Sequence, residues 1–300
     1  MSDTIAALRR QIKGAGDLQS VVRTMKTLAA SSIGQYEQAV RALGDYARTV
    51  ELGLSVCFRG TDSVDAMPGE VDAPDKGAIG AIVFGSDQGL VGQFNELVAD
   101  YAVAALAALT DRPRVWAVGE RVHARLADSG LSPLGLFAVP GSVAAITPLI
   151  GQILLASEVR DHGNAQLHLF YNRPESGAVY APVRQQLLPL DDAWHRQLGA
   201  RPWPTRNLPE VLGSTTATVR ALIREYLFVS LFRACAESLA SENASRLAAM
   251  QRADKNIDEL LEALNGTFHR LRQSGIDEEL FDVISGFEAL TVSRPKAGHE

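Results

Sequence analysis

A glycine-rich segment with serine, aspartate and asparagine side chains is the part of the chain best suited to chemistry. It reads GSDQGLVGQFN, from Gly85 to Asn95, and lies between an apolar run and a helical stretch. In an α/β sheet this is the place where phosphate binds at a helix N-terminus. The glycines fall at 85, 89 and 92, which matches neither GxGxxG nor the Walker pattern GxxxxGK. The spacing favours a tightly packed turn and leaves nucleotide binding as the alternative.

Other residue types that carry chemistry lack the spacing that catalysis or metal binding needs. Cys57 and Cys235 have no second cysteine or histidine at ligand spacing, and the six histidines are scattered. No serine lies in a GxSxG pattern. Glu278, Glu279 and Asp282 share one side of a predicted helix, which favours a solvated or partner-facing surface over acid–base catalysis. The sequence predicts no catalytic, cofactor or metal site.

The composition is that of an ordinary globular protein of one or two domains. Of 300 residues, 46% are hydrophobic and 21% charged, with a net charge of −6 that disfavours nucleic-acid binding. The first residues do not resemble a signal or transit peptide, and no apolar stretch has the length of a membrane span. Because two cysteines cannot form a disulfide framework, we expect a reducing compartment. Any membrane association would be made through a partner.

The first 58 residues carry a sustained heptad pattern. Alternating steps of three and four from Ile5 to Cys57 meet apolar residues at every position except Gln19 and Lys26. Such a run is typical of a coiled-coil seam, and as a helix it would be on the order of 80 Å long. Five glycines would each weaken an isolated helix by about 1 kcal/mol. This helix therefore needs a partner.

The partner is predicted at the other end of the chain. The same stepping from Leu222 to Leu271 meets polar residues at Arg233, Asn243 and Asp254 only. A helix over residues 211–290 would extend on the order of 120 Å, longer than the first. The two seams can meet only in an antiparallel arrangement, so the longer helix has a stretch without a partner in this chain.

The intervening segment, residues 76–200, is predicted to be an α/β domain built on a largely parallel sheet, because short apolar runs alternate with helical stretches. Expected strands lie at 78–84, 114–119, 134–139, 165–171 and 179–190, and expected helices at 95–109, 120–129 and 143–160. Gly- and Pro-rich segments at 59–77 and 199–214 form the joints. The chain is thus divided into a first coiled-coil helix (1–58), the α/β domain (76–200), a last coiled-coil helix (211–290) and a tail (291–300).

Three segments, in order, resemble the γ subunit of F-type ATP synthases. They are LQSVVRTMKTLAAS at 18–31, SDQGLVGQFN at 86–95, and the stretch from SLASENASRLAAM to GIDEELFDVISG at 238–286. Tyr171-Asn172 and QLLPL at 186–190 add to the likeness. The resemblance implies an antiparallel coiled coil of the two terminal helices with an inserted Rossmann-like domain. It also implies a tip of the last helix that projects alone into the catalytic head.

The resemblance implies a rotor without catalytic activity or cofactor, which couples rotation of a proton- or sodium-translocating c ring to the catalytic β subunits. Its partners would be the α and β subunits, ε and the c ring, at the cytoplasmic face of a bacterial inner membrane. Rotor–stator contacts would fall on Met25, Arg246, Arg272 and Gln273. The helix tip would meet an apolar sleeve through Ile276, Leu280 and Ile284. The family loop motif maps onto Ser86, Asp87, Gly89, Leu90, Gly92 and Asn95.

Several positions depart from the family pattern and indicate a divergent branch. Gln88 replaces the loop arginine, Val91 its cysteine, and Asp277 a threonine of the terminal signature. The segment Trp203–Pro209 and the tail after Leu290 also differ. Two other function classes remain open at this point: a Rossmann-type enzyme that uses a nucleotide, and a coiled-coil scaffold unrelated to rotation. Nucleotide titration would test the first, and co-purification with α and β subunits the second.

Overall fold

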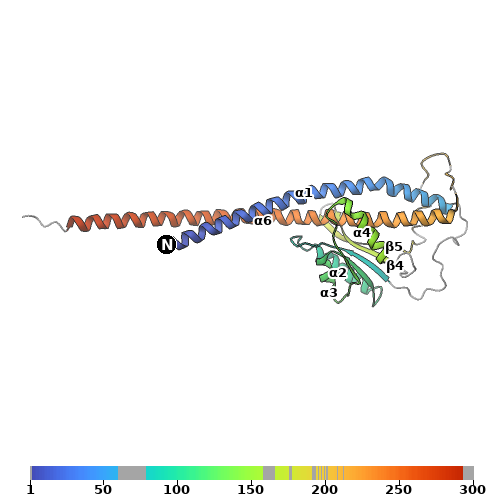
Figure 1. Ribbon diagram of the computed structural model, residues 1–300, viewed down its shortest axis with the longest axis horizontal. Coiled ribbons are helices and arrows are strands. Elements are labelled where there is room, and N and C mark those ends of the chain that lie inside the picture. The colour runs from blue at the N-terminus through green and yellow to red at the C-terminus, as the bar shows by residue number, and fades with distance from the viewer. Residues whose placement is uncertain are drawn as a thin grey trace, which may run out of the picture. The chain divides into compact units, whose positions relative to one another are not determined.

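Two long helices dominate the computed structural model (Figure 1). The structure describes residues 2–59, 79–157, 166–175, 178–190 and 194–292, apart from 195, 197, 199, 201, 208 and 212. Helix α1 spans Ser2–Arg59 and helix α6 spans Thr215–Val292. The chain forms two compact units, Met1–Thr27 with Met250–Glu300 (the coil unit) and Leu28–Ala249 (the sheet unit). Both long helices pass through both units.

The coil unit pairs the start of α1 with the second half of α6. Ala15 and Val22 are buried on α1, as are Met250 and Ile257 on α6. Arg9 stacks over the ring of Phe268 at 5.4 Å, whereas Lys26 contacts Asp254. Because a later residue of α1 meets an earlier residue of α6, the two helices run antiparallel, as the sequence predicts.

The sheet unit contains a five-stranded sheet in the order β3-β2-β1-β4-β5. Strands β1 to β4 run parallel, and β5 pairs antiparallel with β4. The bounds are β1 Ile79–Phe84, β2 Arg114–Val118, β3 Gly135–Phe137, β4 Gln166–Glu175 and β5 Ala178–Leu188. The helices between the strands are α2 Phe94–Ala107, α3 Glu120–Asp128 and α4 Val143–Ala156. These match the predicted elements to within a few residues at each end.

The sheet is covered on both faces, which explains its continuous apolar strands. Ala81 and Val83 of β1 face a core shared with α2 and α3. The alternate residues Ile82 and Phe84 face a second core that contains α4, the middle of α6 and Tyr36 of α1. Successive residues of one strand thus join two separate cores, as the period of two requires.

The middle of α6 is buried on nearly every side, which the heptad pattern did not predict. From Leu227 to Ser245 the helix contacts α1, α4 and the sheet, and almost every side chain is buried or half-buried. Arg233, which the pattern placed in the seam, is an exception with a largely exposed side chain. The placement was wrong because the sheet, as well as α1, determines which sides of α6 are covered here.

On α1 the predicted seam is confirmed: each of its positions from Ile5 to Cys57 is buried or half-buried. In the sheet unit the close approach to α6 is visible at Gly53, where an added Cβ would lie 3.1 Å from Leu222 Cδ1. Nearby, the Tyr46 hydroxyl donates a hydrogen bond to Glu225 at 2.6 Å.

The first joint (residues 60–78) and residues 293–300 of the tail lie outside the described residues.

Candidate functional site

The family loop lies at the carboxyl ends of the parallel strands, between β1 and α2. Its polar side chains bond to one another. The Ser86 amide donates to Asn95 Oδ1 at 2.9 Å, Asn95 Nδ2 donates to Ser86 Oγ at 2.8 Å, and Ser86 Oγ donates to the Gln88 carbonyl at 2.9 Å. Ser86 and Asn95 are both buried. These groups close the loop on itself instead of facing a ligand.

Asp87 ties the loop to the ends of the two neighbouring strands. Its Oδ1 accepts the amide of Glu120, which opens α3 after β2, at 3.0 Å. Its Oδ2 accepts the amide of Val139, just after β3, at 2.8 Å. One carboxylate therefore holds three strand ends together, and both of its oxygens are used within the chain.

Two glycines allow this edge of the sheet to close. A Cβ added at Gly85 would lie 2.3 Å from Val122 Cβ, and one at Gly119 would lie 2.8 Å from the Ser86 backbone. Gly119 also has a φ of +114°, which side-chain-bearing residues rarely adopt. The loop turns through Leu90 and Gly92, with φ of 63° and 59°. Gly89, which completes the loop motif, packs near the Arg121 side chain.

The far side of the loop contacts α6. Ser245 Oγ donates to the Val91 carbonyl. A Cβ added at Gly92 would lie 3.6 Å from Ser245 Oγ. Burial raises the pKa of Tyr180, and its interaction with the Ser245 hydroxyl partly opposes that rise. The loop thus attaches the sheet to the long helix.

Arg246 follows this attachment point and is paired within the chain. Its Nη2 donates to Glu242 Oε1 at 2.7 Å, and both side chains are largely buried. Burial raises the pKa of Glu242, and the positive charge of Arg246 opposes that rise. Any partner that binds this guanidinium has to compete with Glu242.

The last turns of α6 present apolar side chains to solvent. Ile276, Leu280 and Ile284 are exposed by 54%, 56% and 46%, and Phe281, Val283 and Phe287 join them with 69–70%. Exposed apolar surface of this extent marks an interaction site. The sequence predicted the first three residues. Phe281, Val283 and Phe287 were not predicted, because the resemblance named only Ile276, Leu280 and Ile284 for the helix tip.

The comparison with known proteins decides the family. A family model described as ATP synthase matches residues 4–290. The chain is 28% identical over 301 residues to the ATP synthase gamma chain of Nitrosomonas eutropha, covering 94% of this chain and 98% of the relative. The chain belongs to the ATP synthase γ family. It is also 25% identical to the gamma chain of Mycolicibacterium paratuberculosis, covering 98% of this chain and all of the relative.

Solved structures share the fold of this γ-family chain. The rotor of the Euglena gracilis mitochondrial ATP synthase matches with a TM-score of 0.60 and 17% identity, covering 92% of this chain and 100% of the rotor chain. A chain of the OSCP/F1/c-ring assembly from the same organism matches with a TM-score of 0.64 and 18% identity over the full length of both. At these identities the likeness supports the fold alone.

The remaining rotor–stator candidates lie in the coil unit, whereas Arg246 belongs to the sheet unit. Met25 is half-buried on α1, and Arg272 and Gln273 are exposed on α6. Lys26, the residue after Met25 on α1, contacts Asp254, which lies about 18 residues or roughly 27 Å along α6 from Arg272. Met25 and Arg272 are therefore not brought together.

Gln19, Arg23, Lys26 and Asp254 form a polar cluster in the coil unit, the Asp254 clamp, that the sequence analysis did not predict. Asp254 accepts hydrogen bonds from Lys26 Nζ at 2.7 Å and from Arg23 Nε at 3.1 Å, and Gln19 lies beside it. Gln19, Lys26 and Asp254 are three of the five polar interruptions of the two predicted seams, so the signal was present. The sequence could not show which interruptions face one another.

Within the described residues, no three histidine, cysteine, aspartate or glutamate side chains lie close enough to hold a metal ion. Among those same residues, no helix combines the length and the apolar character of a membrane span.

Proposed function

We propose that this chain is the rotating central stalk of an F-type ATP synthase or ATPase and has no catalytic site of its own. The observation that carries the proposal is the last part of α6, where apolar side chains between Ile276 and Phe287 are exposed. The names of the relatives, ATP synthase gamma chain, support the same role. The Euglena neighbour is likewise described as part of a rotor.

The proposed mechanism is coupling through differential contacts. A shaft that is not three-fold symmetric touches each surrounding β subunit differently, so each rotational position favours a different set of β conformations. The apolar tip would turn in an apolar sleeve, where contacts without hydrogen bonds resist rotation little. The apolar seams and the Asp254 clamp would keep the two helices from unwinding under torque.

The contacts that switch β conformations are assigned to Arg272 and Gln273, with Arg246 and Met25 further along the shaft. Arg272 and Gln273 are exposed on α6, which makes them accessible to a partner. A guanidinium suits loops rich in carboxylates because it forms bidentate, charge-assisted hydrogen bonds. Arg246 would exchange its bond to Glu242 for a bond to the head.

The sheet would form the foot of the rotor, held against ε and the c ring at the cytoplasmic face of a bacterial inner membrane. The coupled ion is a proton or sodium. In this arrangement the domains are the first helix (1–58), the foot (76–200) and the last helix (211–290). The loop from Ser86 to Asn95 then serves to attach the foot to the shaft, which agrees with its internally bonded side chains.

The test is reconstitution with the α and β subunits of the same organism. We expect the chain to co-purify with them and the complex to hydrolyse ATP, whereas the isolated chain hydrolyses none above background. Deleting the exposed turns from residue 276 onward should reduce hydrolysis by the complex. Turnover by the isolated chain that is abolished by changing Gly89 or Gly92 would contradict the proposal, as would failure to bind the α and β subunits.

A further inference from the structure

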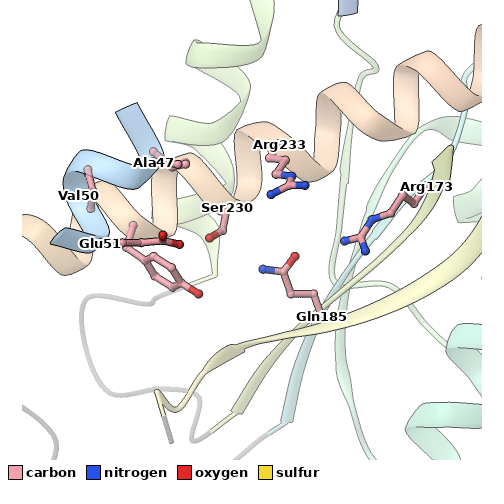
Figure 2. A pocket seen from close by; sticks show the side chains of 9 residues that line it. Ala47, Val50, Glu51, Arg173, Gln185, Ser230 and Arg233 are labelled. Atoms are coloured by element: carbon pink, nitrogen blue, oxygen red, sulfur yellow. The ribbon is translucent and has the colours of Figure 1, made fainter. Parts of the chain in front are cut away.

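A cavity of about 280 Å³ lies inside the sheet unit, between α1, α6 and the strands β4 and β5 (Figure 2). Its volume is close to the lower end of the range for small-molecule sites. Polar side chains from each of these elements line it: Glu51, Arg173, Gln185, Tyr226, Ser230 and Arg233. None of these residues belongs to the rotor–stator contacts or to the family loop.

Two guanidinium groups approach one end of the cavity from different elements. Arg173 extends from β4 and Arg233 from α6, with Gln185 of β5 near both (Figure 2). Both arginines bind the same carboxylate: Glu237 accepts Arg233 Nε at 2.7 Å and Arg173 Nε at 3.0 Å. The Glu237 side chain is 8% exposed, whereas those of Arg173 and Arg233 are 45% and 58% exposed. One buried negative charge is thus shared by two accessible positive charges.

Glu237 uses the Nε atoms of both arginines, which leaves Arg173 Nη1 and both terminal nitrogens of Arg233 for a ligand. Arg173 Nη2 donates to the Tyr171 hydroxyl. Within the described residues, Arg233 has no hydrogen bond from its terminal nitrogens. The excess positive charge and the free guanidinium edge are the features by which proteins recognise phosphate groups.

We propose that this cavity binds a phosphate group, with Arg173 and Arg233 as its ligands and Gln185 and Ser230 as neutral hydrogen-bond donors. Arg173, Arg233 and Glu237 together carry one net positive charge. Glu51 lies on the far side of the cavity from Arg173 (Figure 2). The phosphate is therefore held at the arginine end, away from Glu51, and the group can belong to inorganic phosphate or to a small phosphate ester.

The experiment measures phosphate binding to the purified full-length chain by isothermal titration calorimetry at constant ionic strength. We expect saturable binding of inorganic phosphate or glycerol 3-phosphate. Equal dissociation constants for the two would identify inorganic phosphate as the ligand, and at least tenfold tighter binding of the ester would identify a phosphate ester. Absence of saturable binding of both up to 10 mM, an affinity of about 3 kcal/mol, would overturn the proposal.

Variants locate the site. Arg233→Ala and Arg173→Ala should each weaken binding at least tenfold, and Arg233→Lys should weaken it less because the charge is kept without the planar fork. The matched control is Arg224→Ala, an exposed arginine nine residues earlier on the opposite side of α6. Unchanged binding in both alanine variants would overturn the proposal, as would equal weakening by Arg224→Ala. Melting temperatures in phosphate-free buffer identify any alanine variant that has lost its fold. Where one has, Arg233→Lys is measured in its place, and unchanged phosphate binding by Arg233→Lys would overturn the proposal.

Discussion

Two stretches of the same helix differ sharply in what surrounds them. From Leu227 to Ser245, α6 is enclosed by α1, α4 and the sheet. From Ile276 to Phe287 it exposes apolar side chains to solvent. Both stretches are rich in apolar residues, so composition alone does not separate them. The first buries its apolar surface within the chain, and the second keeps it for a partner.

This difference implies that stability and function depend on different parts of α6. Burial of apolar surface stabilises the fold by roughly 25 cal/mol per Å², and only the enclosed stretch gains this within the isolated chain. Changes in the enclosed stretch should lower the free energy of unfolding, whereas changes in the exposed stretch should alter only the binding of partner subunits.

The largest effect is expected in the enclosed stretch. Leu231 is fully buried, so Leu231→Ala should lower the free energy of unfolding by about 2–5 kcal/mol through lost burial and a residual cavity. The matched change Leu280→Ala, in the exposed stretch, should alter it by less than about 0.5 kcal/mol. Urea denaturation followed by circular dichroism measures both. Equal destabilisation by the two changes would remove the distinction.

A smaller loss is expected where the sheet closes on the family loop. Gly119→Ala places a side chain at a φ of +114° against the Ser86 backbone, which should cost about 1–3 kcal/mol. Gly14→Ala is the opposite control, because Gly14 is exposed in α1 with free space around it. It should stabilise the chain by about 0.5–1 kcal/mol. An unchanged free energy of unfolding for Gly119→Ala in the same denaturation assay would show that the loop adjusts to the added side chain without strain.

The Asp254 clamp should make the pairing of the helices pH-dependent. The hydrogen bond from Lys26 lowers the pKa of Asp254, with a further contribution from Arg23 that burial opposes. Because the folded pKa is depressed, the stabilisation is present above the ordinary carboxyl value of about 4 and is lost as pH falls below it. Asp254→Asn should therefore lower the melting temperature at pH 7.

The difference between wild type and Asp254→Asn should shrink as the pH is lowered from 5 to about 3. Glu262→Gln, an exposed change on the same helix, should show no such pH-dependent difference. A constant difference between wild type and Asp254→Asn across this range would mean that the carboxylate charge is not what the clamp uses.

The smallest effect on stability, with a clear effect on function, is expected at Arg272 and Gln273. Arg272→Ala with Gln273→Ala removes exposed side chains, so helicity and melting should hardly change. Loss of charge-assisted bonds worth about 1.5–3 kcal/mol should nevertheless lower ATP hydrolysis by the reconstituted complex. The control pair, Gln251→Ala with Arg252→Ala, changes the same residue types at an exposed site of α6. Loss of folding with normal specific activity would show that Arg272 and Gln273 are structural.

The secondary structure could be predicted because periodicity determined it. The heptads of α1 and α6 and the apolar runs of β1 and β2 each signal one element. The burial of α6 from Leu227 to Ser245 could not be predicted, because it depends on where the sheet packs. Arg233 shows the consequence: its seam position follows from spacing, but its exposure follows from the sheet and α4.

The candidate site was predicted in its positions but not in its contacts. Ser86, Asp87 and Asn95 were singled out, but their mutual bonds depend on the meeting of three strand ends. The pairing of Arg246 with Glu242 is a local exception, since residues four apart on a helix are neighbours. The Asp254 clamp needed the register between two helices that are over two hundred residues apart in the chain.

Rotation of this chain within the assembled complex can be observed directly. Cys57 and Cys235 are buried, and burial raises the pKa of both thiols, so a cysteine introduced at the exposed Asp111 can be labelled selectively. With the α and β subunits immobilised and a bead attached to this cysteine, ATP should drive sustained rotation in one direction. A bead that stays fixed while the same complexes hydrolyse ATP would contradict the account of this chain as the rotor.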